Sequence, residues 1–221
     1  MPTGAPEQPK RKHPGLFVTF EGPEGSGKTT QMGLLAPWLQ AQGLDVLTLR
    51  EPGGTRIGDQ VRNIVLNPAH TEMLPATEIL LFSAARAQVV GERVLPHLQK
   101  GGVVLCDRYA DSTMAYQGYG LGLDLEALRS ITRFATGGLV PDLTILLDVP
   151  VEVGLRRKAG GCGEEWNRME QKARSYHKRV RAGYHRMASL EPHRWFVADA
   201  TLPIEEVQAA IRERVMREIA A

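Results

Sequence analysis

One glycine-rich segment constrains the fold of this chain more than any other feature. It reads GPEGSGKT, matches the pattern G-x-x-x-x-G-K-[ST], and stands between a short apolar run and a long stretch of helical period. Glycines there let backbone N–H groups face a phosphate, and the helix start adds partial positive charge. The segment predicts a P-loop between a strand and a helix. Its donor-nucleotide ligands are expected to be Gly22, Pro23, Glu24, Gly25, Ser26, Gly27, Lys28 and Thr29.

Two residues of this loop have distinct expected roles. Lys28 would reach the terminal phosphates, and Thr29 would offer its hydroxyl to a magnesium ion. A dinucleotide-binding fingerprint also uses closely spaced glycines, but Lys-Thr at the helix start is not part of it. The motif therefore indicates a nucleoside triphosphate with Mg²⁺.

A magnesium ion beside a P-loop needs a carboxylate at the carboxyl end of a buried strand. Two apolar runs end in aspartate, at Asp107 and at Asp148, and spacing alone does not choose between them. Asp107 is followed by Arg108 and Tyr109, so it brings a cation to the strand end where ligands of open α/β sheets bind. We favour Asp107 as the metal residue.

Short apolar runs alternate with longer helical stretches, which is typical of βαβ units around a parallel sheet. We expect an α/β fold with a five-stranded parallel sheet and helices on both faces. The expected strands are 16–21, 45–50, 103–107, 143–148 and 194–198, and the clearest helices are 28–42, 75–100, 123–135, 151–158, 166–190 and 203–220. Pro96 should kink or shorten the second helix.

Composition limits the class of protein. A chain of 221 residues with 43% hydrophobic content suits a single domain over 16–221, preceded by a disordered tail over 1–15 that is rich in proline and basic residues. The net charge of +2 gives no reason to expect nucleic acid or membrane as a partner. No apolar run approaches the length of a membrane span, and the two cysteines show no metal spacing, so we expect a cytoplasmic protein.

The type of P-loop protein follows from motifs that are absent. Neither Asn-Lys-x-Asp nor Asp-x-x-Gly occurs in the chain, which argues against a GTPase switch. A small-molecule kinase needs cations that face a second phosphate. Arg62, Arg86 and Arg108 lie on segments expected to converge at the carboxyl edge of the sheet.

Several further motifs make the chain resemble the thymidylate kinases from residue 16 to the C-terminal helix. They are FEGPEGSGKTT (20–30), REPGGT (50–55), LFSAARAQ (81–88), DRY (107–109), AYQG (115–118) and PDLT (141–144), in this order. The resemblance implies the P-loop nucleoside monophosphate kinase fold. It also implies transfer of a phosphoryl group from Mg-ATP to dTMP, giving dTDP, by a homodimer. Another pyrimidine nucleoside monophosphate kinase and a non-catalytic nucleotide switch are the alternatives.

The resemblance also implies roles for individual residues. Arg62 and Arg108 would hold the monophosphate, Phe82 would stack on the base, Arg86 would hydrogen-bond it, and Tyr116 would exclude a ribose 2′-hydroxyl. The full expected substrate set is Glu51, Arg62, Phe82, Arg86, Arg108, Thr113, Tyr116 and Gln117. Phe82 could instead belong to the core, because it closes the apolar run 80–82.

The family closes a mobile lid over ATP, expected here at 158–168, but the stretch 159–166 contains no basic residue. Arg157 and Arg168 flank it and are the candidates for stabilising the transition state. Asp199 and Ala200 resemble the loop that lies on the adenine side in this family. The resemblance suggests that the backbone there, at Ala200, recognises the base of ATP. The expected catalytic residues are Glu24, Lys28, Arg108, Arg157 and Arg168.

Overall fold

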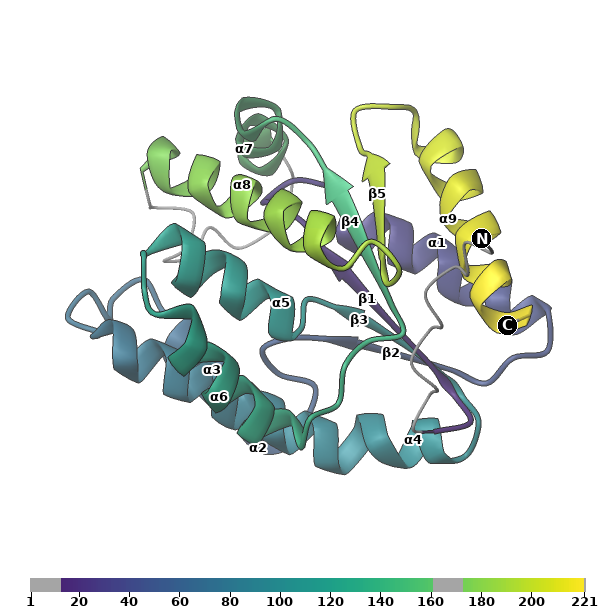
Figure 1. Cartoon of the computed structure of the whole chain (residues 1–221), viewed down its shortest axis with the longest axis horizontal. Coiled ribbons are helices and arrows are strands. Elements are labelled where there is room, and N and C mark those ends of the chain that lie inside the picture. The colour runs from purple at the N-terminus through teal and green to yellow at the C-terminus, as the bar shows by residue number, and fades with distance from the viewer. Residues whose placement is uncertain (1–12, 161–172, 221) are drawn as a thin grey trace, which may run out of the picture.

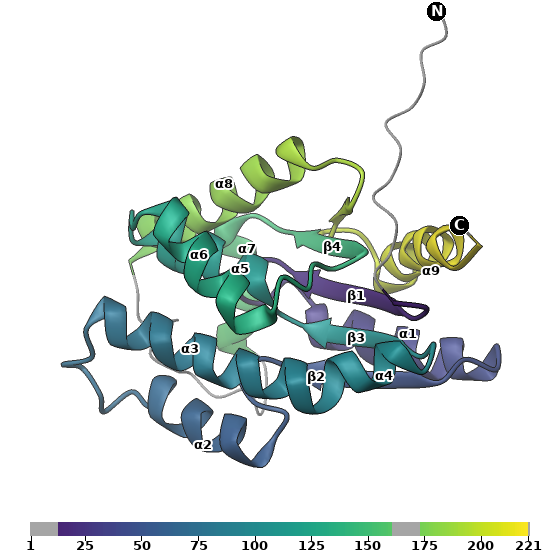
Figure 2. The same ribbon diagram turned by 60° about the horizontal axis from the view of Figure 1, so that its bottom comes forward.

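A computed structural model describes residues 13–160 and 173–220, and it shows a parallel sheet between two layers of helices (Figures 1 and 2). The spatial order of the strands is β2-β3-β1-β4-β5, with every neighbouring pair parallel. Their bounds are β1 Leu16–Glu21, β2 Val46–Arg50, β3 Val103–Asp107, β4 Leu143–Asp148 and β5 Trp195–Asp199. The predicted fold class is confirmed, with small shifts at the ends of β2 and β5.

Helices cover both faces of this sheet (Figure 1). One face packs against α1 and α9, and the other carries most of the remaining helices. The helices are α1 Lys28–Ala41, α2 Arg56–Val65, α3 Pro75–Val89, η1 Val90–Val94, α4 Leu95–Gln99, α5 Ala110–Thr113, η2 Met114–Gly120, α6 Leu125–Thr136, α7 Val151–Gly160, α8 Arg174–Leu190 and α9 Ile204–Ala220.

The central strand β1 explains why the strands are continuous apolar runs. Val18 and Phe20 face the cluster formed with α1 and α9, whereas Phe17 packs into the cluster formed with η1 and α4. All three side chains are fully buried. A strand buried on both faces needs apolar residues at every position, and each such side chain contributes roughly 1.5–3 kcal/mol on burial.

The predicted helix over 75–100 is not uniform. It consists of α3, the π-helical segment η1 and the short α4, which contains Pro96. Proline has no N–H to donate to the preceding turn, and its ring crowds the carbonyl four residues earlier. The widened turn over Val90–Val94 directly precedes this position, and α4 continues through Pro96 to Gln99.

Two helical segments were not predicted from the sequence. α2 begins after Thr55, whose side chain accepts a hydrogen bond from the Gly58 backbone N–H, and this N-cap was a readable signal. α5 and η2 follow the DRY motif without the apolar periodicity of an ordinary helix, because most of their residues are buried.

Parts of the expected tail and lid lie outside the described residues, namely 1–12 and 161–172. Of the tail, residues 13–15 are described, and the Gly15 backbone N–H donates to the carbonyl of Leu98. The helix predicted from residue 166 is described from Arg174 onward as α8. No described helix has the length and apolar character that a membrane crossing requires.

The strand order places the functional edge. The chain runs from β1 through α1 to β2 on one side and later adds β4 on the other side, so its direction of winding reverses at β1. Such a reversal opens a crevice at the carboxyl ends of the strands. Phe20 and Arg50 both pair with Asp107 across this edge, so the P-loop, β2 and β3 end side by side.

Candidate active site

A cleft with about 950 Å³ of space, partly open to solvent, lies at this reversal point. It brings together the P-loop, the ends of β2 and β3, and residues from α2, α3, α5, η2 and α7. The predicted site residues that line it are Glu24, Gly25, Ser26, Gly27, Lys28, Thr29, Glu51, Arg62, Phe82, Arg86, Asp107, Arg108, Thr113, Tyr116 and Gln117. Gly22, Pro23, Arg157 and Ala200 do not line it, and Arg168 lies outside the described residues.

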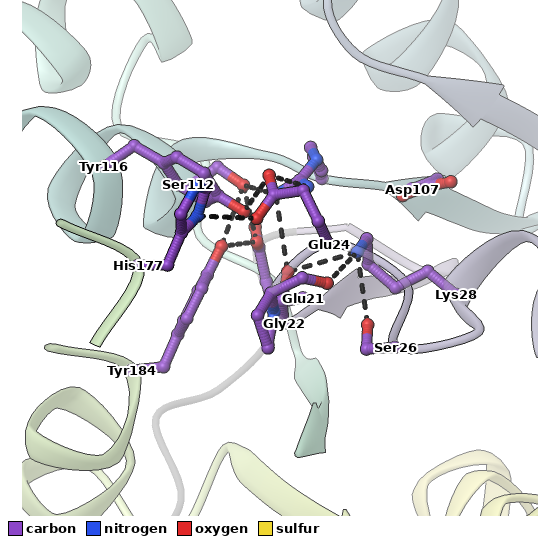
Figure 3. Close-up of polar contacts among 12 residues, drawn as sticks. Glu21, Gly22, Glu24, Ser26, Lys28, Asp107, Ser112, Tyr116, His177 and Tyr184 are labelled. Carbon is purple, nitrogen blue, oxygen red and sulfur yellow. Dashed lines mark hydrogen bonds and ion pairs between the residues drawn. The ribbon is translucent and has the colours of Figure 1, made fainter. Parts of the chain in front are cut away.

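The P-loop is held tightly against α7. A Cβ atom added to Gly25 would lie 2.0 Å from the carbonyl oxygen of Gly154, so the two backbones touch without a side chain between them. Lys28 Nζ donates to the carbonyls of Gly22 (3.1 Å) and Pro23 (2.9 Å) and to Ser26 Oγ at 3.2 Å (Figure 3). Through these three bonds the lysine caps its own loop.

Burial, together with the neighbouring charge of Arg108, lowers the pKa of Lys28 to about 8, although nearby carboxylates counteract it. A lowered lysine pKa means that the buried ammonium lacks enough negative charge around it. An incoming phosphate would supply that charge. The site is thus built for an anion.

Thr29 and Asp107 form the candidate metal end of the cleft. Thr29 Oγ1 donates to Asp107 Oδ2 at 2.9 Å. Asp107 Oδ1 is buried and, in the described structure, has no hydrogen-bond partner. Asp148 differs, because both of its oxygens accept from Arg181 at 2.7 Å and His185 Nε2 lies 3.1 Å away. Of these two aspartates, Asp107 is the one whose described hydrogen bonds include a P-loop residue, Thr29. This contact supports Asp107 as the metal residue.

Glu24 lies at the centre of a polar cluster (Figure 3). Its Oε1 accepts from the Tyr116 hydroxyl at 2.7 Å and from Arg108 Nη2 at 3.2 Å. Nδ1 of His177, a side chain only 1% exposed, lies 3.4 Å from Oε2. Burial alone would raise the pKa of Glu24, but His177, Arg108 and Lys28 together lower it to about 2. Glu24 is therefore an anion that holds Arg108 beside the P-loop.

A second buried acid, Glu21, supports the same cluster from beneath. Its Oε2 accepts from Ser112 Oγ (2.6 Å) and from the Tyr184 hydroxyl (2.7 Å), and its Oε1 accepts from the Tyr109 backbone N–H (2.8 Å). Burial and the charge of Asp111 raise the pKa of Glu21 to about 7. These bonds fix the backbone next to Arg108. The φ angle of Arg108 is 71°, which residues other than glycine rarely adopt.

The opposite end of the cleft is organised around Arg86. Its Nε donates to Glu51 Oε2 at 2.8 Å, Nη1 to Thr113 Oγ1 at 2.9 Å, and Nη2 to the carbonyl of Tyr109 at 3.0 Å. The side chain is 2% exposed, so it cannot rotate without breaking buried bonds. Two of the five guanidinium N–H groups remain for a ligand.

Phe82 and Gln117 complete this end. Phe82 lines the cleft and belongs to none of the core clusters in the described structure, which favours the ligand role over the core role. Gln117 Nε2 donates to Glu78 Oε1 at 2.7 Å. Arg62 of α2 also lines the cleft, and its Nη1 donates to the carbonyl of Pro52 at 2.9 Å.

Two of the residues expected around the ATP site contact each other. Arg157 Nη1 donates to the carbonyl of Ala200 at 2.8 Å, and the Ala200 N–H donates to Asp148 O at the same distance. The Ala200 N–H is therefore already occupied. Lys158, not Arg157, lines the cleft from α7.

Three contributors were missed by sequence reasoning: Glu21, Glu78 and His177. Tyr176, Val180 and Tyr184 of α8 are all buried. Their spacing of four residues is the signal that marks a buried face, and His177 lies beside it. Glu21 and Glu78 gave no signal, because a carboxylate in an apolar run does not reveal its partners.

Comparisons with known proteins agree with this geometry. The family model for thymidylate kinase matches residues 20–211. The chain is 56% identical to the thymidylate kinase of Roseiflexus castenholzii over 207 residues, covering 89% of this chain and 90% of that protein. It is 52% identical to that of Deinococcus radiodurans over 197 residues, covering 89% and 94%.

A crystal structure supports the same assignment. Thymidylate kinase from Ehrlichia chaffeensis superimposes with a TM-score of 0.75 at 31% identity, covering 91% of this chain and 98% of that one. Likeness in sequence and in fold thus extends over nearly the whole chain, including the P-loop and both ends of the cleft. The chain belongs to the thymidylate kinase family.

Proposed function

We propose that this protein transfers the γ-phosphoryl group of Mg-ATP to dTMP, giving dTDP and ADP. The observation that carries the proposal is one continuous cleft with a P-loop at one end and the locked Arg86, beside Phe82 and Gln117, at the other. Arg108 lies between the two ends. Two phosphorylated ligands could therefore meet with their phosphates near Arg108.

The donor end supplies charge and position. P-loop N–H groups and Lys28 would surround the ATP phosphates, and Lys28 would exchange its bonds to Gly22 and Pro23 for phosphate oxygens. The acceptor oxygen of dTMP is already anionic near neutral pH, so the transfer requires no strong general base. Catalysis would rest on aligning the two phosphates and neutralising their charge.

The residues present fit a magnesium ion that arrives with the nucleotide. Within the described ranges, no three His, Cys, Asp or Glu residues cluster in a way that could hold a metal on their own. Magnesium is typically held by one or two carboxylates plus substrate phosphates. Thr29 Oγ1 and the unpartnered Asp107 Oδ1 would hold it. When bound, Mg²⁺ neutralises charge on the transferring phosphates.

The acceptor end would bind the dTMP phosphate through Arg62 and Arg108 and the base through Phe82, Arg86, Thr113 and Gln117. Glu24 aims Arg108, because their ion pair spans 3.2 Å and the guanidinium lies 4.8 Å from the centre of the Tyr116 ring. Tyr116 is itself held by its bond to Glu24. A rigid ring at this position would leave no room for a ribose 2′-hydroxyl.

We also propose that two copies of the chain assemble as a homodimer. α3 and α6 pack against each other and expose large apolar side chains, including Leu80 (59% exposed) and Phe134 (92% exposed). Such side chains are typical of covered surfaces. Sedimentation equilibrium should give twice the chain mass of 24.3 kDa, and Phe134→Glu should shift the protein toward monomer. A wild type that sediments as a monomer would contradict the dimer.

The decisive experiment for the reaction is a coupled assay of ADP release across dTMP, dUMP, dCMP, UMP, dGMP and thymine ribonucleotide. We expect dTMP to be the best acceptor, with dCMP and the ribonucleotide strongly disfavoured. Equal rates with dCMP or UMP would leave only a general pyrimidine monophosphate kinase. No ADP release with any acceptor would favour a nucleotide switch.

A further inference from the structure

The first turn of α3 contains a buried carboxylate that does not line the cleft. Glu78 is 2% exposed, and its Oε1 accepts the 2.7 Å hydrogen bond from Gln117 Nε2 in η2. Gln117 itself lines the cleft, together with Phe82 and Arg86. Glu78 therefore reaches the cleft through the Gln117 amide.

This contact fixes which way the amide faces. An amide carries a donor nitrogen and an acceptor oxygen, whereas a carboxylate only accepts. The nitrogen must consequently face Glu78. Among residues 13–160 and 173–220, no hydrogen bond reaches Gln117 Oε1, so this oxygen is the polar atom left for a ligand.

Arg86 supplies the complementary half of the pattern. Three of its N–H groups are bound to Glu51, Thr113 and Tyr109, and the remaining two can only donate. A fixed donor and a fixed acceptor thus line the same cleft. An imide edge, with a carbonyl oxygen next to an N–H, matches this pair. Cytosine presents an amino group next to an unprotonated nitrogen, which is the reverse.

We propose that Glu78 is a positioning residue that selects the imide edge of the acceptor base by holding the Gln117 oxygen toward the cleft. The proposal rests on the proposed function and adds a cause for its base selectivity. Without Glu78, the Gln117 amide could turn its nitrogen toward the cleft and donate to cytosine N3. Discrimination would then rest on Arg86 alone.

The test measures kcat/KM for dTMP, dCMP and dUMP in the wild type and in Glu78→Met, which keeps the side-chain length and removes the acceptor. The dTMP to dCMP ratio should fall by about tenfold, since one hydrogen bond changes from mismatched to matched. The dTMP to dUMP ratio should stay within about twofold, because both bases present the same imide edge. A general disturbance of the pocket would change both ratios.

Two matched variants separate positioning from mere support of the fold. Glu78→Gln keeps the shape of the side chain but can also donate to the Gln117 oxygen, so it should lower the dTMP to dCMP ratio although it packs as the wild type does. In a Gln117→Leu background, Glu78→Met should change that ratio by less than about twofold, because the group through which it acts is gone. If Glu78→Met does not fold, Glu78→Asp, which withdraws the carboxylate by one methylene, takes its place.

The outcomes are distinguishable. A wild type that discriminates against dCMP, combined with a Glu78→Met variant that discriminates equally well, overturns the role of Glu78 and leaves the proposed function standing. A loss of selectivity that persists in the Gln117→Leu background also overturns it. A wild type that accepts dCMP as well as dTMP overturns both proposals.

Discussion

The two ends of the cleft differ in how their polar groups are satisfied. At the base end, Arg86 and Gln117 are held by buried protein partners, and their spare hydrogen-bonding atoms have fixed directions. At the phosphate end, Lys28 bonds to carbonyls of its own loop, and Asp107 Oδ1 has no partner in the described structure. The Arg86 end is thus preorganised by protein contacts, whereas the P-loop end holds a buried charge and a carboxylate oxygen that a ligand could engage.

The largest effect should come from Lys28→Met, which tests the P-loop end of the cleft. Turnover should fall by roughly a hundredfold to a thousandfold, because a charge aimed at the transferring phosphates is lost. Stability should change little, because burial lowers the pKa of Lys28 and its ammonium therefore contributes little to the folded state. Steady-state kinetics and a thermal melt measure both, with the exposed Lys100→Met as the control. A variant that retains more than about a tenth of wild-type turnover contradicts the assignment.

Glu21 offers a test through pH. The pKa of Glu21 in the folded protein is about 7, above the ordinary value of 4.5. The protonated carboxyl therefore makes its full contribution to the free energy of unfolding below pH 4.5, and this contribution is lost as the pH rises through about 7. Glu21→Gln does not titrate. Relative to the wild type, the variant should therefore gain about 3 kcal/mol of unfolding free energy between pH 4.5 and 7.

Urea unfolding at a series of pH values measures this difference, and subtraction of the wild type cancels the other titrating groups. The exposed Glu72→Gln is the control and should show a flat difference. A flat difference for Glu21→Gln as well would mean that this carboxyl titrates normally in the fold.

Arg86 tests the preorganised end. Arg86→Met alone would leave Glu51 buried without its partner, so the informative variant is Arg86→Met/Glu51→Gln, which removes both charges. We expect kcat/KM for dTMP to fall by roughly tenfold to a hundredfold. The preference over dCMP should shrink while KM for ATP changes little. If the affinity for ATP changes while the preference for dTMP over dCMP stays intact, Arg86 does not contact the acceptor base.

The smallest effects should separate Arg157 from Lys158 on α7. Lys158 lines the cleft, so Lys158→Met should lower kcat by about tenfold with little change in KM for dTMP. Arg157 bonds to Ala200 and should mainly raise KM for ATP when replaced by Met. If Arg157→Met lowers kcat more than Lys158→Met does, the expectation from the sequence was the better one.

How much the sequence predicted depended on how local each signal was. The P-loop, the strands and Asp107 were readable because glycine spacing and short apolar runs act within one segment. The partners of the site residues were not readable. Glu78 lies 39 residues from Gln117, and Tyr184 lies 163 residues from Glu21, and only the packing of helices on the sheet brings them together. The role of Arg157 was inferred from a flanking position, which does not show where a long side chain points.

The contact between the P-loop and α7 limits which sequences this site accepts. A Cβ on Gly25 would lie 2.0 Å from the carbonyl oxygen of Gly154, and one on Gly154 would lie 2.3 Å from the carbonyl oxygen of Glu24. The obstacle on each side is backbone, which cannot rotate away as a side chain can. In a saturation library selected for activity, both positions should return only glycine. Neither residue could compensate for a change in the other, because two main chains already occupy the space between them.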